Sequence, residues 1–257
     1  MTVKAAPGGF PQRRVAEIPS VSVAQMREIQ RAAQEDLGYD ILQITEGAGR
    51  SIAELALAMM GGKGRGQRVV ILAGGGNKGG AGLCAARHLV NWGVAAEPVF
   101  GEIESEMSFA TRRQLNTLRA IGVVDRDEGM SEIDLEDRLA GSALIIDALI
   151  GFGLEGPPAG LAAALTELAV ASGRPTLAVD MPTGVSATTG EVHSPAIRAM
   201  TTLILDLPKV GILEPRCRPC VGELYLADLG IPRVIHERLG IRANGIFSEG
   251  PIVHLRR

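Results

Sequence analysis

The chain has 257 residues, 46% of them hydrophobic and 21% charged, which is enough for one substantial hydrophobic core. Its 26 basic and 29 acidic side chains leave a net charge of −3, which argues against nonspecific binding to nucleic acid or to a membrane surface. Aromatic residues make up only 3%, whereas 33 glycines favour recognition by backbone loops. Three cysteines are too few for a disulfide framework and suit a reducing, cytoplasmic compartment.

The N-terminal part of the chain is predicted to be a tail followed by two helices. Residues 1–20 are expected to form a flexible tail rather than an export signal, because their basic residues precede no apolar run. No segment has the roughly 18 apolar residues needed to cross a bilayer. A capping box and apolar residues at helical spacing predict a helix over residues 22–37. A second helix is predicted over residues 41–60, where two glycines end it.

The remainder alternates between predicted strands and helices. Short runs rich in Val, Ile and Leu predict strands at residues 68–73, 96–100, 143–149, 175–180, 201–207 and 223–228. Helical patterns separate the first four, at about residues 79–92, 105–121 and 160–172. This order predicts an α/β fold, a three-layer, doubly wound, Rossmann-like sandwich around a mostly parallel sheet. We expect a single domain over residues 21–245, followed by a C-terminal tail or edge strand at residues 246–257.

A glycine-rich loop follows the first predicted strand. Six of the nine residues from Gly74 to Gly82 are glycines, and a helix is predicted directly after them. Such a loop lets backbone N–H groups approach an anion, and the helix N-terminus adds a partial positive charge. A tight turn without any ligand is the alternative. A Walker-type phosphate loop is excluded because Gly79, not Ser or Thr, follows Lys78.

Charged residues also stand at the ends of three later strands. Asp147 and Asp180 each end a predicted strand and precede a turn rich in glycine or proline. Either one alone could be a helix cap or an Asx-turn. Because ligands of open α/β sheets bind beyond the carboxyl ends of the strands, the two carboxylates and the glycine loop converge on one crevice. Lys209 follows the fifth strand at the same level, as either an exposed lysine or a ligand contact.

Five ordered motifs resemble the YjeF N-terminal domain, the NAD(P)H-hydrate epimerase family. They are the glycine loop, DALIGFGL at 147–154, DMPTGVSATTG at 180–190, the Pro208-Lys209 pair and DLGIP at 228–232. The resemblance extends over residues 22–240 and implies repair of NADH and NADPH that have been hydrated at C6 of the nicotinamide ring. Such an enzyme interconverts the R and S epimers, and a separate dehydratase consumes the S form. The chain is too short to carry that dehydratase domain as well.

The resemblance also implies which residues form the site. Substrate contacts would come from Asn77, Lys78, Gly79, Gly80, Ala81, Gly151, Phe152, Gly153, Leu154, Glu155, Gly156, Pro157, Asp180 and Lys209. A potassium ion would be held at the positions of Lys78, Asp147 and Thr183. Asp180 is the candidate acid and base: protonating the C6 hydroxyl lets the ring nitrogen expel water, which leaves a planar cation that water attacks from either face.

The glycine loop departs from the family pattern at two positions. The usual loop reads Gly-Asn-Asn-Gly-Gly-Asp-Gly, but here Lys78 replaces the second Asn and Ala81 replaces the Asp. The loop therefore gains a cation and loses an anion beside two carboxylates. We expect the Lys78 ammonium to fold into the potassium position and to pair with Asp147 and the Thr183 hydroxyl. The alternative is that Lys78 points to solvent and the cation site is lost.

Two other functions fit parts of the sequence. One is a noncatalytic nucleotide-binding or protein-interaction module of the same fold, which the changes at Lys78 and Ala81 favour. The other is an NAD-dependent oxidoreductase, with Glu102 as the ribose acceptor. The Cys217-x-x-Cys220 motif lacks the second pair that a zinc site needs. A homodimer is expected if apolar area on the first two helices is exposed.

Overall fold

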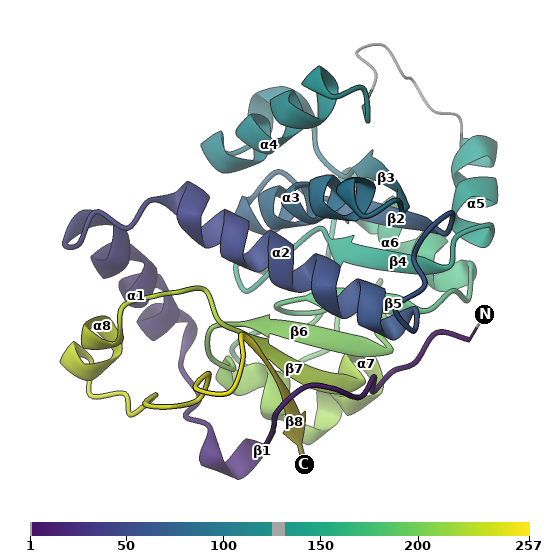
Figure 1. Cartoon of the computed structure of the whole chain (residues 1–257). Coiled ribbons are helices and arrows are strands. Elements are labelled where there is room, and N and C mark those ends of the chain that lie inside the picture. The colour runs from purple at the N-terminus through teal and green to yellow at the C-terminus, as the bar shows by residue number, and fades with distance from the viewer. Residues whose placement is uncertain (1, 125–131) are drawn as a thin grey trace.

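The computed structural model describes residues 2–124 and 132–257 and has one central sheet (Figure 1). Within this part of the chain the sheet has eight strands in the order β1-β8-β7-β6-β5-β4-β2-β3. The strands are β1 (Gln12–Arg14), β2 (Arg68–Ala73), β3 (Ala95–Phe100), β4 (Leu144–Ala148), β5 (Thr176–Val179), β6 (Thr201–Leu205), β7 (Glu223–Ala227) and β8 (Ile252–Arg256). Neighbouring strands are parallel except β7 and β8, which confirms the predicted mostly parallel α/β sheet.

Helices cover both faces of the sheet. They are α1 (Val23–Glu35), α2 (Ile41–Met59), α3 (Asn77–Asn91), α4 (Phe109–Ala120), α5 (Glu132–Ala140), α6 (Gly160–Ala171), α7 (Arg218–Val221) and α8 (Arg233–Arg238). Helix α2 packs along α3, and α3 packs on α4, on one face (Figure 1). Helices α5 and α6 lie together on the opposite face, so the layers follow the predicted three-layer order. None of the helices in the described ranges is long and apolar enough to span a membrane.

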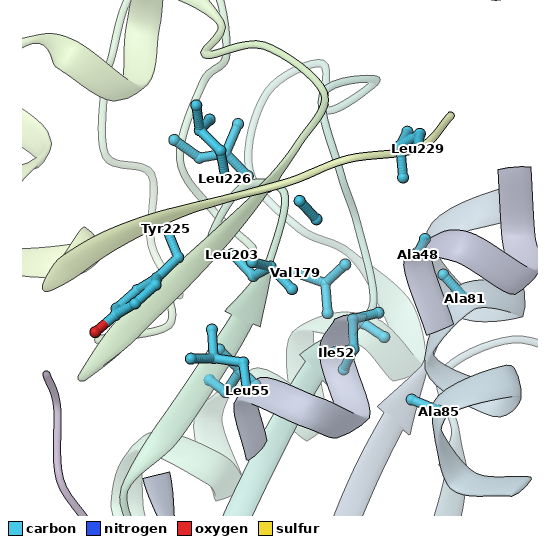
Figure 2. Packing of buried hydrophobic residues seen from close by; sticks show 14 of the residues in the cluster. Ala48, Ile52, Leu55, Ala81, Ala85, Val179, Leu203, Tyr225, Leu226 and Leu229 are labelled. Atoms are coloured by element: carbon cyan, nitrogen blue, oxygen red, sulfur yellow. The ribbon is translucent and has the colours of Figure 1, made fainter. Parts of the chain in front are cut away.

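The core follows from the continuous apolar strands. In β2, Val69 and Ile71 point into the larger core cluster under α2 and α3, whereas Val70 and Leu72 point into the cluster under α5 and α6. Figure 2 shows the larger cluster, with Ile52 and Leu55 of α2 facing side chains of β5, β6 and β7. Burying a side chain of this size stabilises the fold by about 1.5–3 kcal/mol. A strand that is buried on both faces needs apolar residues at nearly every position, and β2 supplies them from Val69 to Ala73.

The N-terminal segment differs from the expected tail. Residues 12–14 form β1, which pairs with β8 and is the edge strand next to it. The C-terminal segment is therefore an inner strand rather than a tail or an edge, because β8 lies between β7 and β1. Hydrophobic patterning misses β1 because backbone pairing holds this strand of Gln and Arg in place. Side chains of the core also reach the segment: the hydroxyls of Thr201 and Tyr225 donate to backbone oxygens of residues 5 and 7.

Other departures are local. The helix predicted over residues 105–121 is a 3₁₀ turn, η2 (Glu104–Glu106), followed by α4, because Ser108 caps the N-terminus of α4. The sequence patterns predict no helix at α5, α7 or α8. The apolar surface expected on the first two helices is covered, since the large apolar side chains of α1 and α2 are buried or half-buried. Exposed large apolar side chains, such as Phe109 of α4 and Leu161 of α6, lie outside these two helices.

Candidate functional site

A cavity of about 680 Å³ opens beyond the carboxyl ends of the central strands. Strand β2 lies between β3 and β4, so the chain leaves β2 toward one side of the sheet and later returns on the other. Ligands of open α/β folds bind at such a switch point. The cavity walls come from the first turns of α2, the glycine loop, residues 149–153, residues 159–162 and the ends of β5 and β6. Its volume lies within the range of small-molecule sites.

The glycine loop is closely packed against its neighbours. A Cβ atom on Gly79 would lie 1.8 Å from the backbone oxygen of Gly74, and one on Gly74 would lie 2.1 Å from the backbone oxygen of Leu149. Only glycine fits either position. Helix α3 begins at Asn77, with Gly76 as its N-cap, so its N-terminal end meets the cavity. Its first N–H groups and partial positive charge suit a phosphate or another anion.

The side chain of Lys78 turns inward from the first turn of α3. The residue is 9% exposed, and its Nζ lies among oxygens from β4 and from the loops that follow β4 and β5. Nζ donates to the backbone oxygens of Met181, at 2.8 Å, and Ile150, at 2.9 Å. The Oδ1 atom of Asp147 is 3.3 Å away and the hydroxyl oxygen of Thr183 is 3.5 Å away. Of the two alternatives for Lys78, the structure therefore has the inward one.

Asp147 holds the loops that carry these oxygens through hydrogen bonds. Its side chain is fully buried, and its two oxygens accept bonds from the Thr183 N–H, the Thr183 hydroxyl and the Leu149 N–H at 2.8, 2.7 and 3.1 Å. Burial lowers the pKa of Lys78, and the negative charges of Asp147 and Asp180 only partly oppose that effect. The oxygens that would ligate potassium already surround an ammonium. The residues present therefore leave no place for a potassium ion at the same point.

Asp180 and Lys209 form a second buried ion pair, which lines the cavity. Asp180 has a φ of 64°, in the left-handed region, and ends β5. Its Oδ1 accepts from Lys209 Nζ at 2.5 Å and from the Leu205 N–H at 3.2 Å. Lys209 is fully buried rather than exposed; its Nζ also donates to the Leu205 backbone oxygen at 2.9 Å and lies 5.6 Å from the centre of the Phe152 ring. These contacts fix a carboxylate and an ammonium at the cavity wall.

The structure divides the expected site residues into three groups. The cavity is lined by Asn77, Lys78, Ala81, Gly151, Phe152, Gly153, Asp180 and Lys209. Asp147 and Thr183 lie behind Lys78 and hold it. Outside the described cavity wall are Gly79, Gly80, Leu154, Glu155, Gly156 and Pro157. Gly79 and Gly80 serve packing instead, against Gly74 and against Thr111 of α4.

Sequence patterns missed the part of the wall that comes from the first two helices and from β3. These residues include Gln30, Ile44, Thr45, Ala48 and Glu106. Leu229 also lines the cavity, but it follows β7 and lies in the DLGIP motif. Ala48 and Ala81 lie close together on neighbouring helices (Figure 2). The only sequence signal for this wall is the Glu-Gly-Ala-Gly stretch at 46–49. Nothing in that stretch alone shows which face of the helix meets the cavity.

A second polar cluster joins α2 to α3 away from the cavity wall. Glu46 contacts His88 Nε2 at 2.8 Å and the Cys84 thiol at 3.3 Å. Three such groups could hold a metal ion, but Arg87 Nη2 donates to both Glu46 and Cys84. Burial and the Glu46 charge raise the pKa of Cys84 to about 12, so this thiol stays protonated. The cluster is an ion-pair link between two helices.

Comparison with known proteins agrees with this geometry. The family described as YjeF-related protein N-terminus matches residues 42–211. The chain is 40% identical over 239 residues to a protein of Dehalogenimonas lykanthroporepellens named NAD(P)H-hydrate epimerase, and the match covers 93% of each chain. A protein of Rhodopirellula baltica with the same name is 31% identical, with 85% of this chain and 87% of that one covered.

One further relative is a longer protein, and another similar protein has a solved structure. A Moorella thermoacetica protein named bifunctional NAD(P)H-hydrate repair enzyme is 30% identical, and this chain spans 41% of its length. The crystal structure of yeast ynu0 has a TM-score of 0.78 at 25% identity and covers 93% of this chain and 100% of its own. The family match extends over most of the chain, and the glycine loop, Asp147 and Asp180 lie inside it. The chain therefore belongs to the YjeF-related N-terminal family.

Proposed function

We propose that the chain is an NAD(P)H-hydrate epimerase, an isomerase that interconverts the R and S forms of NADH and NADPH hydrated at C6. The observation that carries this proposal is the buried pair of Asp180 and Lys209, which presents a carboxylate and an ammonium to a cavity of about 680 Å³. The name NAD(P)H-hydrate epimerase, carried by the relative that is 40% identical, supports this proposal. Catalysis then requires that a proton reaches the C6 hydroxyl, that this hydroxyl leaves as water, and that a water molecule adds to C6 again.

The Asp180–Lys209 pair can supply that proton. When the pair protonates the C6 hydroxyl, the C6–O bond breaks, its electrons leave with the water, and the ring nitrogen lone pair stabilises the planar cation. The pair is then left with a net charge of −1 beside that cation, which favours the charged intermediate in a buried site. Water attacks either face of C6, and its proton returns to the pair. Atoms and charge balance without a cofactor.

The Lys78 ammonium takes the place of the potassium ion that the family resemblance implies. It brings a single positive charge to the oxygens of Asp147, Thr183 and residues 150 and 181. These contacts hold the loop after β4 against the loop after β5. The protein thus carries its own monovalent cation, and its activity does not require potassium.

The proposal also includes a partner enzyme, a cellular compartment and an oligomeric state. A separate dehydratase that consumes one epimer is part of the proposal, because epimerisation alone does not remove the added water. Three free, buried cysteines suit the reducing cytoplasm. A homodimer remains a prediction, which light scattering after gel filtration tests.

The test is epimerisation of purified hydrated NADH by the wild type and by Asp180→Asn. Asparagine tolerates the left-handed backbone of residue 180 but removes the carboxylate through which the pair exchanges its proton, so the rate should fall by a factor of about 100 or more. Asp206→Asn is the matched control, because Asp206 is also buried, ends β6 and has a φ of 63°, but pairs with His236 outside the cavity wall. Thermal melting checks that both variants fold.

The main alternative is a noncatalytic module of the same fold. It is favoured by Ala81, which lines the cavity where the family pattern has an acid. A wild-type protein that binds ADP-ribose but leaves the epimers to equilibrate at their spontaneous rate would establish this alternative and exclude the enzyme.

A further inference from the structure

The two ends of the cavity differ in charge. At the end formed by β5 and β6, Asp180 and Lys209 compensate each other. At the end formed by β3, the wall carries Glu102 and Glu106. Lys78 and Lys209 are the only lysines or arginines among the described residues of the cavity wall, and both ammonium groups are bonded to carboxylates. The β3 end is therefore acidic and has no cation of its own.

Glu102 is held in place over the glycine loop. It lies two residues beyond the end of β3, and its Cγ lies 2.8 Å from the position that a Cβ on Gly75 would take. Its Oε1 accepts the N–H of Ile103 at 3.0 Å, and the residue lines the cavity, so its second oxygen is available to accept from a ligand. The backbone oxygen of Glu106 also lies against Gly75. The absence of a side chain at Gly75 is what lets this acidic wall approach the loop.

The direction of a bound dinucleotide follows from the proposed function, on which this inference rests. The nicotinamide ring must lie at Asp180 for its C6 hydroxyl to receive a proton. The diphosphate then meets the N-terminus of α3. The adenosine ribose extends toward β3, where dinucleotide-binding folds place an acidic residue against the ribose hydroxyls and an arginine against a 2′-phosphate. Here that end of the cavity has two acids.

We infer that Glu102, assisted by Glu106, accepts the hydroxyls of the adenosine ribose and rejects a phosphate at its 2′ position. The chain thus acts on hydrated NADH in preference to hydrated NADPH. The 2′-phosphate would bring about two more negative charges to the end of the cavity that Glu102 and Glu106 line. Coulomb repulsion of that size at a partly exposed site corresponds to roughly a tenfold loss of affinity.

The experiment compares ADP-ribose with its 2′-phosphorylated form by titration calorimetry at low ionic strength. The wild type should bind ADP-ribose about tenfold more tightly. The double variant Glu102→Gln/Glu106→Gln should reduce that ratio to about threefold or less. Glu104→Gln is the matched control, because Glu104 lies in the same turn but pairs with Arg119, at 2.8 Å, and should leave the ratio unchanged.

The same proteins are then assayed for epimerisation of hydrated NADH and hydrated NADPH. Equal affinity for the two ADP-ribose ligands, or a ratio unchanged in the double variant, would overturn the inference. Discrimination between the ligands without epimerisation of either hydrate would support the inference about the ribose while contradicting the proposed reaction. A higher kcat/KM for hydrated NADH that declines in the double variant through KM would support both.

Discussion

At the scale of single residues, two aspartates at the ends of neighbouring strands have different roles. Asp180 and Asp206 both have φ near +64°, a conformation that costs an ordinary side chain about 1–2 kcal/mol and that Asp and Asn tolerate best. Asp180 turns its carboxylate toward Lys209 and the cavity. Asp206 turns its carboxylate toward His236 Nε2, 2.9 Å away, which ties α8 to the end of β6.

The pair of Asp206 and His236 makes stability depend on pH. Burial lowers the pKa of His236, but the hydrogen bond and charge of Asp206 outweigh burial, so the folded-state pKa is raised above 6.5. Below about pH 6.5 the imidazole is charged in both states and the pair stabilises the fold fully; that contribution is lost as the pH rises through the raised folded-state pKa. The melting temperature of the wild type minus that of His236→Gln should therefore be largest near pH 6 and smaller at pH 8.5. A difference that grows with pH would contradict this assignment.

At the scale of elements, the glycine loop is fixed by close contact more than by backbone freedom. Gly79 and Gly76 are both glycines in or next to the first turn of α3, yet their surroundings differ. A Cβ on Gly79 would overlap the Gly74 backbone oxygen, whereas a Cβ on Gly76 has nothing within 4 Å. This contrast separates the glycines that the fold requires from one that it does not.

Gly79→Ala should therefore destabilise the fold by about 2–3 kcal/mol, the usual cost of overpacking, and should move the loop away from β4. Gly76→Ala should cost under about 1 kcal/mol, since it loses only a favourable N-cap residue. Urea unfolding of the two variants measures both effects. Equal losses of stability would show that the close contact is not what selects glycine at position 79.

At the scale of the whole molecule, the N-terminal segment completes the sheet. Residues 12–14 pair with β8, and residues 5 and 7 accept hydrogen bonds from Thr201, which is fully buried, and Tyr225. Deleting residues 2–18 should lower the free energy of unfolding by about 2–4 kcal/mol, because two buried hydroxyls lose their acceptors and β8 becomes an open edge. Deleting residues 2–3 alone should have little effect. Full stability after the longer deletion would make the segment the tail that its sequence suggests.

Much of the fold could be predicted because its signals are local. Continuous apolar runs such as 68–73 and the capping box at 22–25 give strands and helices without knowledge of their neighbours. The inward Lys78 was also predictable, because an added cation beside Asp147 and Asp180 has an obvious partner. Strand β1 was not, because the strand that it pairs with, β8, lies near the other end of the chain. The acidic wall at Glu102 and the Arg87 link to Glu46 likewise arise only when distant elements meet.

The central claim is that the Lys78 ammonium does the work of a bound monovalent ion, and the potassium dependence of epimerisation tests it most directly. Wild-type activity and melting temperature should be the same in potassium and in tetramethylammonium chloride. Lys78→Asn restores the residue that the family loop usually carries and frees the oxygens of Asp147 and Thr183, so its activity and its melting temperature should both rise with added potassium. A wild type that loses activity when potassium is withdrawn, together with a variant whose melting temperature ignores the ion, would contradict the account.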